Sequence, residues 1–121
     1  MGQRGSQMTD YDPGFEQLRL TILSRQYPDI VIHKARVIFF AEDNKDRISW
    51  SRWFLEDGRV GALCIETGFK IDLMNLLDIF IQYRGRCNQK PKSAGVVEFS
   101  GGTISIEWHN TTNAEVLIAV G

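Results

Sequence analysis

The segment from Asp72 to Gly85 constrains the fold more than any other part of this chain. Its polar residues Asn75, Asp78 and Gln82 fall three and four positions apart, and nearly every other position is apolar. This spacing predicts a helix with one narrow polar stripe. Asp72 can cap its first turn, and Gly85 can take the left-handed position after its last. Because so apolar a helix must be buried over most of its circumference, we expect it to cross the face of a sheet.

The residues before this helix have the pattern of strands. Leu18, Leu20 and Ile22 alternate with polar residues, which is the period of a half-buried strand. The turn-forming pair Asp57-Gly58 separates two apolar runs and predicts a hairpin. We therefore expect four strands in this half, within the segments Leu18–Ile22, Val31–Ala41, Ile48–Leu55 and Val60–Thr67.

Three further strands are expected after the helix. Gly101-Gly102 and the segment 110–113 are hairpin signals between short apolar runs. The strands are Val96–Phe99, Thr103–Trp108 and Glu115–Val120. Short connections make such strands antiparallel. The sequence thus predicts an α+β fold, with one buried helix on one face of an antiparallel sheet of about seven strands, four before the helix and three after it. Residues 1–14 are expected to form a flexible leader, and residues 15–121 a single domain.

Composition restricts the classes of partner. The chain has 121 residues and a formal net charge of −1, so no global charge attracts it to nucleic acid or to an anionic membrane. No apolar stretch approaches the roughly 20 residues that span a bilayer. The N-terminus has no apolar signal segment. We therefore expect a cytoplasmic protein in which Cys64 and Cys87 are free thiols.

Residues that carry chemistry are scattered along the chain. His33 and His109 fall on different expected strands, and the two cysteines do not form a Cys-x-x-Cys pair. This predicts neither a metal site nor a bound cofactor. A catalytic site assembled across strands from His33, Cys64 and Glu66 remains an alternative, because such a site leaves no local motif.

Two segments are candidates for binding. The first is the aromatic strand, whose residues could form a partner surface together with the charged loop before it; these residues are Trp50, Trp53, Phe54, Asp43 and Asp46. Aromatic residues are enriched in binding hot spots, although a core needs them as well. A homodimer would also cover the second face of the sheet, as curling of the sheet would.

The second candidate is the basic stretch after the helix. It carries four cations and no acid, and these are Arg84, Arg86, Lys90 and Lys92. They could contact a phosphate or an acidic partner. They could equally complement the partial negative charge at the end of the helix. Only Tyr83 supplies an aromatic ring nearby, so the pattern is weak for single-stranded nucleic acid.

The order of elements also resembles a known group of proteins. A helix followed by the closing strands Val96-Val97-Glu98-Phe99, Thr103–Trp108 and Val116–Val120 resembles small bacterial immunity proteins of polymorphic toxin systems and related uncharacterised single-domain families, over roughly residues 60–120. The resemblance implies a protein that blocks a toxin's active site and has no chemistry of its own. We therefore expect a non-catalytic protein-binding module, with a nucleic-acid or phosphate binder and a small enzyme as the alternatives.

Overall fold

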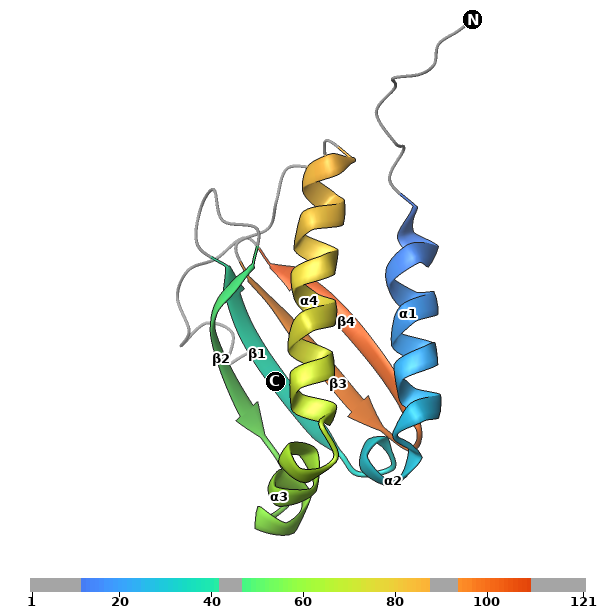
Figure 1. Ribbon diagram of the computed structural model, residues 1–121, viewed down its shortest axis with the longest axis vertical. Coiled ribbons are helices and arrows are strands. Elements are labelled where there is room, and N and C mark those ends of the chain that lie inside the picture. Colours follow the sequence, from blue (N-terminus) through green and yellow to red (C-terminus); the bar gives the residue numbers. More distant parts are fainter. Residues whose placement is uncertain (1–11, 42–46, 88–93, 110–121) are drawn as a thin grey trace, which may run out of the picture.

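The computed structural model describes residues 12–41, 47–87 and 94–109, which form one antiparallel sheet with helices across one face. The strand order is β2-β1-β3-β4. The helices α1 and α4 cross the same face of the sheet, and α2 and α3 lie at one end of it (Figure 1). The elements are α1 (Pro13–Gln26), α2 (Pro28–Val31), β1 (Ala35–Ala41), β2 (Ile48–Phe54), α3 (Gly58–Glu66), α4 (Phe69–Arg86), β3 (Ala94–Ser100) and β4 (Thr103–His109). The α+β class and the antiparallel sheet are confirmed.

The predicted count of seven strands and one helix is wrong, because two expected strands are helical. Leu18–Ile22 lies in α1 and Val60–Thr67 falls almost entirely in α3. The buried side chains of α1 are Glu16, Leu20, Leu23 and Ser24. The first three are spaced by four and three residues, while Leu18 is 58% exposed. Apolar residues at alternate positions had masked this helical spacing.

Asp57 starts a helix and does not form the predicted hairpin turn. Its Oδ1 accepts hydrogen bonds from the amides of Arg59 at 2.9 Å and Val60 at 3.1 Å. These two bonds satisfy the unpaired donors of the first turn of α3. The bond from Val60, the largest cause, lowers the pKa of the Asp57 carboxyl.

The predicted helix exists but is longer than Asp72–Gly85. It begins at Phe69 after Gly68, whose φ of 85° is left-handed, and continues past Gly85 to Arg86. Asp72 therefore lies in the first turn, where its carboxylate accepts a hydrogen bond from the hydroxyl of Tyr27. The expected burial on a sheet face is confirmed, since six side chains of α4 are buried: Phe69, Leu73, Leu77, Phe80, Ile81 and Tyr83.

The strands β3 and β4 match the predicted strands Val96–Phe99 and Thr103–Trp108 closely. β3 and β4 pair from Ala94↔His109 to Ser100↔Thr103, and Gly101 and Gly102 turn between them with φ of 57° and 95°. This is the glycine hairpin expected from the sequence. β1 is shorter than predicted because α2 occupies the chain up to Val31. The expected strand Glu115–Val120 and residues 1–11 of the leader lie outside the described residues.

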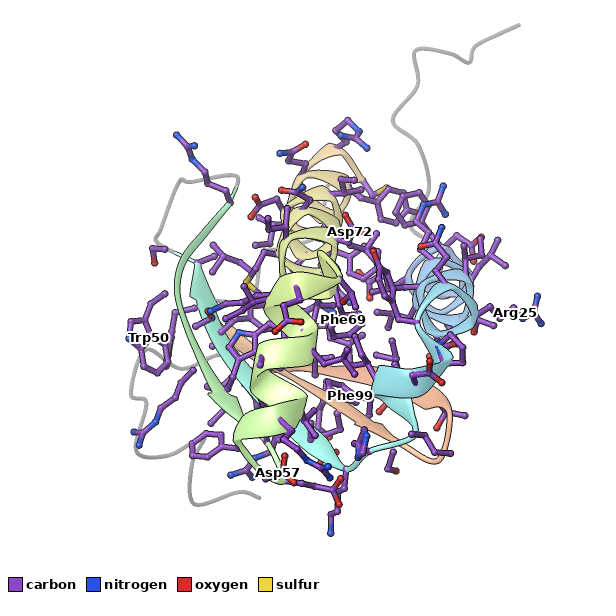
Figure 2. The ribbon with its side chains drawn as sticks, turned by 60° about the horizontal axis from the view of Figure 1, so that its bottom comes forward. Arg25, Trp50, Asp57, Phe69, Asp72 and Phe99 are labelled. Carbon is purple, nitrogen blue, oxygen red and sulfur yellow. The ribbon has the colours of Figure 1, made fainter. Side chains whose placement is uncertain are left out.

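The main core fills the space between the sheet and the two long helices. Val37 and Phe39 of β1 and Phe99 of β3 point to the helices and are almost completely buried. Phe69 meets Phe99 edge to face, with ring centroids 5.5 Å apart (Figure 2). One face of the sheet thus packs against the two long helices, and the opposite face carries a smaller buried cluster of Ile38, Ala94 and Val96.

Candidate partner-binding surface

Strand β2 sends its aromatic side chains to opposite faces of the sheet. Trp53 stands opposite Val37 and therefore faces the helices, whereas Trp50 stands opposite Phe40 and faces away from them. Phe54 is four residues after Trp50 and shares its face. Two of the three predicted surface aromatics therefore lie together, and the third lies on the other side. The acids Asp43 and Asp46, which were predicted to join them, are outside the described residues.

Trp53 packs against the core. Its ring meets that of Phe69 edge to face at 6.2 Å, and the ammonium of Lys70 lies 5.7 Å from its centroid. Its indole Nε1 is buried and has no hydrogen-bond acceptor in the part of the chain that the structure describes. These contacts assign Trp53 to packing between the sheet and α4.

The helix-free side of β1 and β2 carries a mixed aromatic and cationic surface. We call Arg36, Phe40, Trp50, Arg52 and Phe54 the aromatic–arginine surface. The rings of Phe40 and Trp50 lie 5.1 Å apart. The guanidinium carbons of Arg36 and Arg52 lie 5.3 Å and 5.1 Å from the centroid of Phe54. Trp50 is 41% exposed and projects outward from β2 (Figure 2).

A second, smaller apolar cluster lies beside this surface on the same face of the sheet. Ile38 and Ala94 are fully buried and Val96 is nearly so, all on the face away from the helices. Phe40 and Phe54 pack against them. Because close-packed side chains keep their rotamers, the aromatic–arginine surface is held on a rigid base.

The other half of this face is acidic. Glu107 pairs with Val96 and Glu98 pairs with Ser105, so both carboxylates stand on the β3–β4 side of the same face. Glu107 contacts His109, with 3.0 Å between Oε1 and Nε2. Arginines thus occupy one half of the sheet face and carboxylates the other, which gives a partner a charge pattern to match.

A shallow groove of about 300 Å³ runs between β2 and α4. Ser49, Ser51 and Trp50 line it from the strand, and Met74 and Asp78 from the helix. Asp78 accepts a hydrogen bond of 2.7 Å from the amide of Ile48, the first residue of β2. The groove borders the outer edge of the sheet, next to Trp50.

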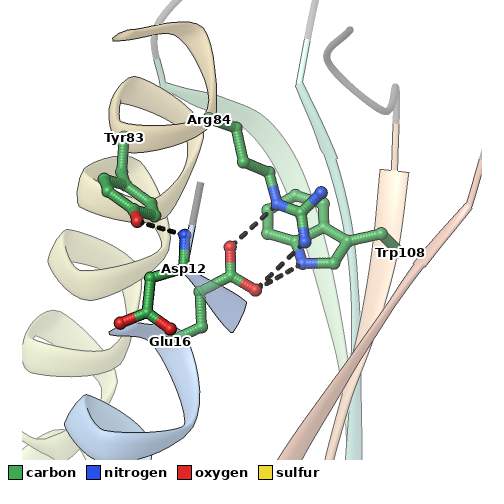
Figure 3. Close-up of polar contacts among 5 residues, drawn as sticks. All are labelled: Asp12, Glu16, Tyr83, Arg84 and Trp108. Atoms are coloured by element: carbon green, nitrogen blue, oxygen red, sulfur yellow. Dashed lines mark hydrogen bonds and ion pairs between the residues drawn. The ribbon is translucent and has the colours of Figure 1, made fainter. Parts of the chain in front are cut away.

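Arg84 forms a largely buried ion pair. Its Nε and Nη2 donate to the two carboxylate oxygens of Glu16 at 2.8 Å and 3.1 Å, and the indole of Trp108 donates to the same carboxylate at 3.1 Å (Figure 3). The guanidinium also stacks 4.4 Å from the Trp108 ring. Glu16 is 4% exposed. This network joins α1, α4 and β4, and no local pattern in the sequence connects its members.

The same end of the molecule contains a second link between the two long helices. The rings of Phe15 and Tyr83 stack at 3.7 Å, and the Tyr83 hydroxyl accepts a hydrogen bond of 2.7 Å from the amide of Asp12 (Figure 3). Arg86, in the last turn of α4, is exposed. Lys90 and Lys92 are outside the described residues. Of the four predicted anion contacts, the structure therefore places only Arg86 at an exposed position.

The residues considered for catalysis make separate contacts in the described part of the chain. His33 Nδ1 lies 2.7 Å from the carboxylate of Glu56, and no hydrogen bond there joins it to Cys64 or Glu66. Cys64 is 1% exposed, and burial raises the pKa of its thiol, which disfavours the reactive thiolate. Cys64 and Cys87 are both free and buried. No group of three or more metal-binding side chains occurs among the described residues.

Comparisons with protein-family models, with curated proteins and with solved structures found no match to this chain. None of the helices that the structure describes is long and apolar enough to cross a membrane.

Proposed function

We propose that this protein is a non-catalytic protein-binding module that contacts its partner through the aromatic–arginine surface. The observation that carries the proposal is Trp50, a tryptophan 41% exposed whose ring lies 5.1 Å from that of Phe40, on a sheet face that also carries Phe54. Contiguous exposed apolar side chains, more than single ones, mark a binding surface, and the Trp50 ring is in contact with that of Phe40. Tryptophan and arginine are also the residues most enriched in binding hot spots.

The charges on this surface favour a partner that presents acidic and apolar side chains together. The guanidinium groups of Arg36 and Arg52 both lie close to the Phe54 ring. A partner carboxylate could bind a guanidinium while its apolar neighbour covers Trp50. Because the supporting cluster of Ile38, Ala94 and Val96 is already packed, little ordering cost is expected on binding.

Single-stranded nucleic acid is the second candidate, because aromatic rings beside arginines can stack on bases. Glu98 and Glu107 on the same face oppose a phosphate backbone. Arg84, which the basic stretch would contribute, is paired with Glu16. These observations favour a protein partner.

The narrower form of the proposal is an immunity protein that blocks a toxin. It is supported by the order of elements in the described part of the chain after α3, where the buried helix α4 precedes the hairpin of β3 and β4. A cytoplasmic location remains a prediction, supported by the two free thiols.

The test begins with capture of a partner by the full-length chain from a nuclease-treated lysate of the source organism. The dissociation constant of the purified partner is then measured for the wild type, for Trp50→Ala and for the control Ile65→Ala, which truncates a 66% exposed residue of α3. We expect Trp50→Ala to weaken binding about tenfold or more and Ile65→Ala to leave it unchanged.

Unchanged affinity of a correctly folded Trp50→Ala variant contradicts the proposed surface. Loss of all captured material on nuclease treatment favours the nucleic-acid alternative. If the captured partner is a toxin, co-expression of this protein should restore growth of the cells that produce the toxin. If the complex forms and growth is not restored, the immunity proposal is refuted, and the protein-binding proposal stands.

A further inference from the structure

The two edges of the sheet differ in how they are covered. At the β4 edge, α1 packs alongside the strand, and the Gln17 side chain donates a hydrogen bond of 3.2 Å to the carbonyl of Ile104. At the β2 edge, no further strand pairs with Ile48–Phe54 among residues 12–41, 47–87 and 94–109. Figure 1 shows α1 beside β4 and no described helix outside β2. Within the described residues, the sheet therefore has one edge covered by α1 and one edge, that of β2, with which no strand pairs.

Strand β2 has few of the features by which proteins usually block an open edge, although its register with β1 shifts between Phe40 and Ala41. It is seven residues long and contains neither proline nor lysine, and Arg52 is its single charged residue. Such blocking normally relies on short strands, prolines and charges. Asp78 holds the amide of Ile48, at the start of the strand. From Ser49 onward, within the described chain, no bond is made by the peptide groups that point away from β1.

Resting on the proposed function, we propose that the partner contributes an extended segment that pairs with the outer edge of β2 as a fifth strand. Alternate side chains of a docked strand point to opposite faces. On the helix side they enter the groove of Ser49, Ser51, Met74 and Asp78, whose mixed polar and apolar lining suits small side chains such as valine. On the other side they meet Trp50 and Arg52, which suit acidic side chains. Backbone pairing supplies affinity, and these two faces supply selectivity.

The probe is an acetylated and amidated eight-residue peptide in which glutamate and valine alternate, titrated into the full-length protein. Binding is followed by the amide chemical shifts of Ser49, Trp50, Ser51 and Arg52. Two further peptides carry N-methyl groups on the glutamates only or on the valines only. In a docked strand only one of these two sets of N–H groups faces β2. We therefore expect one methylated peptide to bind at least about tenfold more weakly and the other to bind as the parent does.

Charge reversal provides an independent control. A peptide with lysine in place of glutamate should bind weakly to the wild type and more tightly to Arg52→Glu, which changes an exposed side chain.

Three results overturn strand docking. The first is equal binding of both methylated peptides, and the second is no binding of the parent peptide up to millimolar concentration. The third is a dimer, formed without peptide, in which the β2 amides resist hydrogen exchange. That dimer would assign this edge to a second copy of the chain. If Trp50→Ala still weakens the captured partner in those cases, the proposed function stands and only the strand mode fails.

Discussion

Replacing Arg84 by methionine should strongly destabilise the fold, because it breaks the ion pair between α4 and α1. Methionine retains a flexible apolar stem that can cover the Trp108 ring. It removes the donors at 2.8 Å and 3.1 Å from the Glu16 carboxylate. That carboxylate is 4% exposed, so water cannot readily replace the lost bonds. The Trp108 indole remains as a donor at 3.1 Å.

The size of the effect follows from these contacts. Removal of one partner from a buried ion pair costs about 3–5 kcal/mol. Because the indole bond remains, we expect the lower end, about 3 kcal/mol, which is a large share of the roughly 5–15 kcal/mol that stabilises a typical domain. The double variant Glu16→Leu/Arg84→Met removes both charges and leaves the Trp108 N–H without its acceptor, so its cost should be about 1–3 kcal/mol.

The assay is urea unfolding, followed by circular dichroism, of the wild type, Glu16→Leu, Arg84→Met and the double variant. A double-mutant cycle isolates the coupling between the two side chains, which we expect to exceed about 2 kcal/mol. Arg86→Met is the matched control, since Arg86 is exposed in the same turn of α4, and it should change stability by less than about 0.5 kcal/mol.

Two results would refute this reasoning. A loss below about 1 kcal/mol in Arg84→Met would mean that the pair is effectively solvated. Additive effects of the two single variants would mean that the side chains do not stabilise each other, whatever their distance.

Three other predictions concern separate parts of the fold. Gly85→Ala should stabilise the protein by about 0.5–1 kcal/mol in urea unfolding, because Gly85 is helical and its added Cβ meets no atom within 4 Å. Gly95→Ala should destabilise it by about 1–3 kcal/mol, since its Cβ would lie 2.5 Å from the Phe39 ring. A loss of stability in Gly85→Ala would instead support the left-handed cap predicted from the sequence. The pKa of Asp57 is lowered in the folded state, so its stabilising effect is present above the ordinary pKa of 3.8 and is lost as the pH falls through the pKa of the folded protein. When urea unfolding is measured at several pH values, the difference in stability between the wild type and Asp57→Asn should shrink in acid. A difference that stays constant with pH would contradict the helix cap. Cys64 should react slowly with iodoacetamide at pH 7 in the native protein and quickly after unfolding, because burial raises the pKa of its thiol, and fast native labelling would reopen the case for a nucleophile.

The local sequence pattern was sufficient to predict an element where the spacing of apolar residues and a turn-forming residue pair indicated the same structure. The pair Gly101-Gly102 between two alternating runs predicted the hairpin of β3 and β4, since glycine takes positive φ at little cost. The nearly all-apolar run around Leu77 predicted a helix on a sheet face, and α4 is that helix. In both segments the residues dictate the conformation with little help from distant contacts.

Local pattern failed where apolar residues satisfied two periodicities at once. Leu18, Leu20 and Ile22 alternate, yet Leu20 and Leu23 are also three apart, and the helix prevails because it buries that pair. Asp57-Gly58 suits a hairpin and a helix start equally well. The choice between a hairpin and a helix at this position depends on the segments that pack against it, so tertiary packing decides it.

The sequence by itself determined that this chain forms an antiparallel sheet covered by an apolar helix. Only the tertiary structure decided which aromatic residues are available to a partner. Trp50 and Trp53 are three positions apart, so they lie on opposite faces, and the register with β1 selects which face meets the helices. Likewise, Arg84 is committed to Glu16 across 68 positions of sequence. Side-chain type and spacing are local properties, whereas exposure and pairing depend on contacts between segments far apart in the chain.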